Sequence, residues 1–168
     1  MDKQVRVEMA QAKKLVGKRM RMSLADNKTG ELWRHFLPRR REIPHYTGTA
    51  LYSVEVYDDQ YFARFDPARA FEKWAAIEVT DYAAVPEGLE PIMLPVGLYA
   101  VFVHRGPASA GRETYRYIFG TWLPESEYVL DNRPHFAVMG EKYRNEDPGS
   151  EEEIWIPVKL RSEGPASS

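Results

Sequence analysis

The same order of elements, strand, helix, strand and strand, occurs twice along these 168 residues. Strands are predicted where apolar and polar residues alternate, and a helix where apolar residues recur every three or four positions. The strands cover about 13–23, 51–57 and 71–79 in the first half and 98–104, 136–143 and 150–159 in the second. The pattern predicts one α+β domain over residues 1–160, made of two βαββ repeats over about 3–84 and 92–160.

The apolar residues of the two halves coincide when one half is shifted onto the other. A shift of 86 positions places Leu32, Trp33, Phe36, Leu37 and Pro38 on Ile118, Phe119, Trp122, Leu123 and Pro124. A shift of 79 positions places Ala75, Ile77 and Val79 on Ile154, Ile156 and Val158, but Trp74 on Glu153 and Ala76 on Trp155. We therefore expect pseudo-two-fold symmetry, with both helices on one face of an antiparallel sheet and a ligand cleft at the seam on the other. Chance similarity between amphipathic elements is the alternative.

The last predicted strand places a carboxylate beside an indole on the face that should line this cleft. Glu153 and Trp155 are two residues apart, so in a strand their side chains point the same way. A carboxylate that leaves water is costly without a partner, and a cationic ligand can be that partner. Aromatic rings would add cation–π attraction of about 0.5–2 kcal/mol each. The simpler interpretation is a solvated strand-end glutamate, and Glu151 and Glu152 are expected to be solvated.

Other residues are candidates for the same cleft, each with a plainer alternative. Glu78 lies on the corresponding face of the first half, where an exposed strand glutamate is equally expected. Aromatic residues in the predicted strands can wall a cleft, although aromatic strand residues are more often ordinary core. The candidate ligand-binding residues are Glu153, Trp155, Glu78, Trp74, Tyr99, Phe136 and Tyr143.

Composition and motifs exclude several classes of function. The chain has no cysteine, and its four histidines are too widely separated for a metal-binding spacing. It contains no phosphate-binding loop, dinucleotide fingerprint or nucleophile elbow, so no cofactor is expected. Net charge is −2, and no apolar run reaches the roughly 18 residues of a membrane helix or resembles a signal peptide. These features fit a cytoplasmic protein with a disordered tail over 161–168.

Three segments resemble the GyrI-like small-molecule-binding family, which also supplies the effector-binding domain of AraC-type and multidrug-responsive transcription regulators. The segments are Gly97–Gly106, Phe119–Pro124 and Glu151–Lys159, with weaker support from Arg133–Phe136 and Glu141–Tyr143. The resemblance covers roughly residues 3–160. It implies two βαββ repeats, a central cleft, and an acidic residue among aromatic rings that binds lipophilic cations.

The resemblance leaves several functions open, and the first is a small-molecule sensor or sequestering module. Other members modulate gyrase, which would require a protein partner. Some branches hydrolyse strained cyclopropane compounds; in such an enzyme Glu153 would act as acid or base, with Tyr143 or Tyr99 orienting a proton. The full regulators carry a DNA-binding domain before this module, whereas this chain opens directly into strand residues. We therefore expect no direct nucleic-acid binding, and the oligomeric state stays open.

Overall fold

The computed structural model describes residues 5–107, 110–140 and 149–161. The strands in this part of the chain are β1 (Val5–Ala10), β2 (Lys13–Met22), β3 (Leu51–Val56), β4 (Phe71–Val79), β5 (Glu90–Leu94), β6 (Gly97–Arg105), β7 (Tyr128–Leu130), β8 (His135–Met139) and β9 (Glu151–Leu160). The α-helices are α1 (Thr29–Phe36), α2 (Gly111–Tyr117) and α3 (Leu123–Glu125). Short helical segments of other types are η1 (Leu37–Glu42), η2 (Tyr61–Ala63) and η4 (Ile118–Trp122). The predicted α+β class is confirmed.

The two predicted helices are present, but prolines affect their ends differently from the prediction. The sequence predicts that Pro38 ends the first helix; α1 instead passes directly into the 3-10 segment η1, with Pro38 at its start. A proline is tolerated there because the first N–H groups of a helical segment have no intrahelical acceptor. The second helix runs from α2 through the π segment η4 into α3, where Pro124 lies within the last turn.

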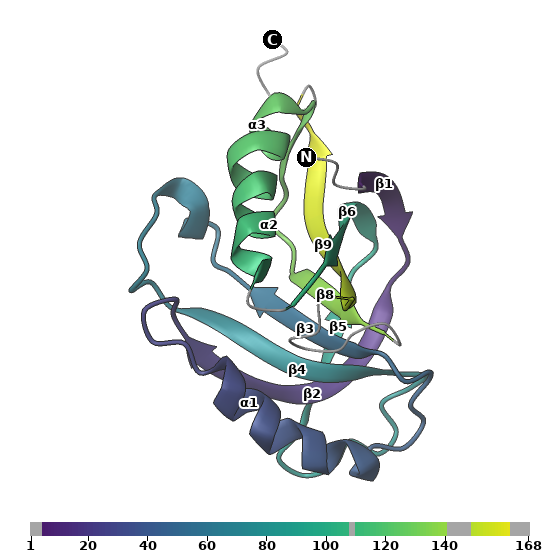
Figure 1. The fold of residues 1–168 in the computed structure, drawn as a ribbon. Coiled ribbons are helices and arrows are strands. Elements are labelled where there is room, and N and C mark those ends of the chain that lie inside the picture. The colour runs from purple at the N-terminus through teal and green to yellow at the C-terminus, as the bar shows by residue number, and fades with distance from the viewer. Residues whose placement is uncertain (1–4, 108–109, 141–148, 162–168) are drawn as a thin grey trace.

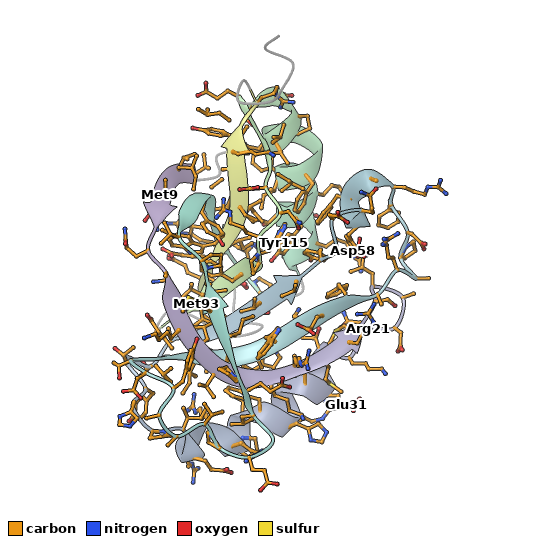
Figure 2. All side chains as sticks on the ribbon, turned by 180° about the vertical axis from the view of Figure 1, so that it is seen from behind. Met9, Arg21, Glu31, Asp58, Met93 and Tyr115 are labelled. Carbon is orange, nitrogen blue, oxygen red and sulfur yellow. The ribbon has the colours of Figure 1, made fainter. Side chains whose placement is uncertain are left out.

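All strand pairs are antiparallel, and the sheet order is β1-β6-β9-β8-β3-β4-β2-β5, with β7 paired to β9. The two ends of this order are joined by the chain itself. Only residues 11–12 separate β1 from β2, and residues 95–96 separate β5 from β6. β1 thus continues into β2, and β5 into β6. Because β1 pairs with β6 and β2 pairs with β5, these two bent segments connect the ends of the strand order, and the sheet curls into a ring. Figure 2 shows Met9 of β1 and Met93 of β5 on the same side of the molecule.

Both helices cover the outer face of this curled sheet, as predicted. Ser53 of β3 pairs with Ala75 on one side and Ala137 on the other, and Ala137 pairs with Ile154. Residues directly opposite in antiparallel strands point to one face, so these four share a face. Ala75 packs in the cluster under α1 and Ile154 in the cluster under α2. In Figure 1, α1 lies beneath β2 and β4, and α2 lies beside β9.

The order of strands is the same in the two halves of the sheet. From the seam outward it is β3-β4-β2 on one side and β8-β9-β6 on the other. The starts of β2 and β6, at Lys13 and Gly97, are as far apart in the sequence as those of β3 and β8, at Leu51 and His135. This arrangement agrees with an internal duplication, but the duplication and its pseudo-two-fold symmetry stay predictions.

β5 and β7 lie outside the strands that the sequence predicts. β5 contains Pro91; among the described residues it pairs with β2 alone, and an edge strand tolerates proline because one side of it forms no ladder. β7 has three residues, too few for a period-2 pattern to stand out. The strand predicted over 136–143 is observed as His135–Met139, and residues 141–143 lie outside the described residues.

Candidate functional site

The inner face of the sheet carries Glu153 at the edge of a cluster of aromatic rings. Trp155 donates its indole N–H to Glu153 Oε1 at 3.1 Å, so the expected pairing of carboxylate and indole is present. Arg6 of β1 donates from Nη2 to Glu153 Oε2 at 3.4 Å, and its guanidinium lies 5.6 Å from the centre of the Trp155 ring. Arg6 also bonds to Glu8. The side chain of Glu153 is 39% exposed, so solvent reaches this corner of the sheet.

Behind Glu153, three rings from three adjacent strands pack against one another. Phe136 of β8 stacks on Trp155 of β9 with 5.2 Å between ring centres and 15° between planes. Tyr99 of β6 meets both rings edge-on, at 5.2 Å and 5.8 Å. All three side chains are buried, and the Tyr99 hydroxyl donates to the carbonyl of Pro134. The predicted cleft-wall residues are thus brought together, but in this structure they fill the inner face with their own rings.

Glu78, the second predicted carboxylate, faces the same interior from the other half of the sheet. The hydroxyl of Tyr52 donates to Glu78 Oε1 at 3.2 Å. Burial, followed by the negative charges of Glu78 and then Glu153, raises the pKa of Tyr52 above its ordinary value. Tyr52 therefore lies within electrostatic range of both carboxylates, and its ring is 6.1 Å from that of Phe136. Tyr52 is not among the residues predicted for the cleft, although its spacing of two from Val54 places it on the same face of β3.

Trp74 belongs to the same buried cluster but makes its polar contact elsewhere. Its indole N–H donates to Glu72 Oε1 at 2.8 Å, and Arg19 donates to Glu72 Oε2 at 2.8 Å. This trio repeats the chemistry of Trp155, Glu153 and Arg6 on another pair of strands. Trp74 is therefore an interior wall residue whose hydrogen bond is not directed at Glu153, and Glu72 offers a matched comparison for Glu153.

The three consecutive glutamates Glu151–Glu153 form the start of β9 and are less exposed than predicted. Glu152 was predicted to be solvated, but it is only partly exposed: it points to the helix-covered face, and burial is the main cause that raises its pKa. Its register partner on β6 is His104, a buried residue. Glu151 forms an ion pair with Arg105 at 3.0 Å. Side chains alternate strictly along this strand, so Glu152 lies on the same face as Ile154. The two-residue spacing in the sequence could therefore have predicted that Glu152 lies under the helices.

The helix-covered face also holds a largely buried ion pair that was not predicted from the sequence. Lys73 Nζ lies 3.3 Å from Glu55 Oε2, and Ser53 donates a hydrogen bond to the same oxygen at 3.2 Å. Burial raises the pKa of Glu55, and the ammonium of Lys73 opposes that rise. No sequence motif marks this pair, because Glu55 and Lys73 are simply polar residues in two alternating strands.

Metal binding finds no support among the described residues, where no group of three or more His, Asp or Glu side chains is arranged to hold an ion. In the same part of the chain, no helix is long and apolar enough to cross a membrane. Tyr143, the remaining predicted site residue, lies outside the described residues.

The described residues of the inner face can supply carboxylates, aromatic rings and a tyrosine hydroxyl to a small molecule.

The family model for the GyrI-like small molecule binding domain matches residues 3–159 of this chain. Among curated proteins, the transcriptional regulator BrlR of Pseudomonas aeruginosa is 29% identical over 130 residues, which are 77% of this chain and 46% of that regulator. The chain thus spans less than half the length of this relative.

Two solved structures show the same fold at low sequence identity. The C-terminal domain of EcmrR is 18% identical with a TM-score of 0.71, covering 95% of this chain and 99% of that one. SAV2435 bound to tetraphenylphosphonium is 16% identical with a TM-score of 0.69, covering 95% of this chain and 94% of that one. Likeness at this identity concerns the fold, and the ligand named is that of SAV2435.

Proposed function

Because the chain belongs to the GyrI-like small-molecule binding domain family, we propose that it is an effector-binding module whose ligand is a lipophilic cation held at Glu153. The apolar part of the ligand would lie against Trp155 and the adjoining rings. The observation that carries this proposal is that Glu153 and Trp155 together already hold a cation, the guanidinium of Arg6. That tetraphenylphosphonium is bound in the similarly folded SAV2435 supports the choice of ligand class.

Arg6 is the internal competitor that such a ligand has to displace. Its guanidinium pairs with Glu153 and lies over Trp155, and its side chain is 47% exposed. An exposed ion pair of this kind is worth about 0–1 kcal/mol, so displacing Arg6 costs a ligand little. A bulky ligand also has to move the packed rings of Phe136 and Tyr99, because they occupy the inner face. The proposal thus combines an available charge site with an apolar interior that opens on binding.

The test is a calorimetric titration of tetraphenylphosphonium into the wild type and three variants. Glu153→Gln is expected to weaken binding about tenfold or more, because it removes the charge while keeping the volume. Arg6→Met is expected to strengthen binding about two- to fivefold, because it frees Glu153 from an exposed ion pair. Glu72→Gln is the matched control and should change the affinity little, since Glu72 has the same indole and arginine contacts elsewhere.

Two results would count against this assignment in different ways. Equal affinities of the wild type and Glu153→Gln would remove Glu153 from the site, even if the cation still binds. Absence of binding to the wild type and to Arg6→Met alike would reject the lipophilic cation as the ligand class. A role as a hydrolase stays a prediction without a specific structural argument, because Tyr143 lies outside the described residues and the hydroxyl of the alternative, Tyr99, donates to the carbonyl of Pro134.

A further inference from the structure

A hollow of about 110 Å³ opens on the helix-covered side of the sheet, away from Glu153. It lies where β3 ends and β8 begins, between the loop that follows β3 and the loop that precedes β8. Its lining residues are Tyr57, Asp58, Asp59, Phe62, Leu130, Asp131, Asn132, Arg133 and His135. Figure 2 marks Asp58, in the loop that follows β3. Because His135 and Phe136 are consecutive in β8, the hollow and the inner ring cluster are on opposite faces of the sheet.

His135 forms part of the wall of this hollow and is enclosed by aromatic rings. Phe62 stacks on the imidazole with 5.5 Å between ring centres and 18° between planes, and Tyr57 meets it edge-on at 4.9 Å. Only 6% of His135 is exposed. Within the described residues, the imidazole nitrogens of His135 and the Tyr57 hydroxyl make no hydrogen bond, and Nη1 of the neighbouring Arg133 is a buried nitrogen without a partner. Buried polar groups are normally paired, so the imidazole and the Tyr57 hydroxyl are available to something that enters the hollow.

The imidazole is uncharged over the physiological pH range. Burial, assisted by the positive charge of Arg133, lowers the pKa of His135 to about 3. A neutral imidazole has one N–H donor and one acceptor nitrogen, and the Tyr57 hydroxyl can act in either sense. The floor of the hollow therefore recognises a neutral hydroxyl or amine group, and it does not itself repel a cation.

The rim of the hollow is acidic and only partly neutralised. Asp58 pairs with Arg69 at 2.9 Å, and Asp131 pairs with Arg133 at 3.0 Å. Asp59 is exposed and makes no ion pair within the described residues. With Asp58 and Asp131 each paired to an arginine, the carboxylate of Asp59 is the charge of the lining that favours a positively charged guest. The exposed ring of Phe62 offers such a guest an aromatic surface.

From these contacts we propose that the hollow is a second small-molecule site, which binds a compact aromatic amine. The aromatic ring of the guest lies against Phe62. An uncharged hydroxyl or amine group on the guest hydrogen-bonds to His135 and Tyr57. The ammonium group is held at Asp59 on the rim. This site is separate from the effector site, because the two lie on opposite faces of the sheet; Arg133 of the hollow lies 4.7 Å from the centre of the Tyr99 ring and is the contact between them.

The probe is tyramine, followed by nuclear magnetic resonance of the histidine ring signals of the intact chain. Tyramine is expected to shift the His135 signals saturably. His135→Phe, which keeps a buried ring and removes both nitrogens, and Asp59→Asn should each weaken tyramine binding about fivefold or more, as followed by calorimetry. Asp59 is exposed, so its variant keeps the fold even if His135→Phe does not. The matched anion 4-hydroxyphenylacetate should not bind.

Two control variants separate this site from the rest of the molecule. His45→Phe alters an exposed histidine outside the hollow, and Glu153→Gln alters the effector site; both should bind tyramine as the wild type does. The proposal would be overturned if tyramine left the histidine signals of the wild type unshifted. Unchanged affinity in Asp59→Asn would also overturn it, as would affinity that falls in Glu153→Gln, because tyramine would then bind at the effector site.

Discussion

Lys73→Met is expected to lower the free energy of unfolding by about 3–5 kcal/mol at neutral pH, because it leaves the carboxylate of Glu55 buried without its partner. The two side chains are 18% and 11% exposed, and 3.3 Å separates Nζ from Oε2. After the substitution, Ser53 remains as a hydrogen-bond donor to Glu55, but it carries no charge. Urea unfolding monitored by tryptophan fluorescence measures the difference.

The penalty of this variant should depend on pH in a defined direction. The folded-state pKa of Glu55 is raised above the ordinary 4.5 by burial, and removal of Lys73 raises it further. Above pH 4.5 the folded state then holds a proton that the unfolded chain releases, so stability falls as pH rises through the raised pKa. We expect the loss to be small near pH 4 and full above that raised pKa. The double variant Lys73→Met/Glu55→Gln should recover most of the loss, and a single variant as stable as the wild type at pH 8 would contradict the buried pair.

Phe136→Ala should cost about 3–5 kcal/mol of unfolding free energy, because it deletes the ring shared by the stacked core of the inner face. Phe136 is 2% exposed, stacks on Trp155 and meets Tyr99 edge-on. Its loss leaves a cavity that these larger rings fill only in part. The control is Phe65→Ala, since Phe65 is 80% exposed and should change stability by less than about 0.5 kcal/mol. A loss below about 1 kcal/mol for Phe136→Ala would mean that the inner face is loosely packed.

Most of the sheet could be predicted from the sequence because its central strands alternate with a clean period of two. The face shared by Ile154, Ile156 and Val158 packs under the helices as the alternation predicts. The curling of the sheet was not predicted. It depends on the ladder that β1 and β2 form with β6 and β5, and such a pairing between distant segments leaves no local pattern. β5 was missed for a related reason, since Pro91 is acceptable only because the strand pairs on one side.

The candidate site was predicted in part. The alternation places Glu153 and Trp155 on one face, and in the structure the rings of Tyr99 and Phe136 pack against Trp155. It gives no information about Arg6, because that residue reaches Glu153 from β1 through the pairing of β1 with β6. The solvation of Glu152 was misjudged because a run of acids suggested a solvated end, whereas the parity of the strand places it under the helix-covered face.

The central claim, that the inner face binds a lipophilic cation at Glu153, is tested most directly with two probes of the same shape and opposite charge. Tetraphenylphosphonium and tetraphenylborate present four phenyl rings each, so burial of apolar surface alone favours neither. Calorimetric titration of the wild type is expected to give an affinity for the phosphonium at least about tenfold higher, because Glu153 attracts the cation and repels the anion. Equal affinities, or tighter binding of the borate, would contradict the claim.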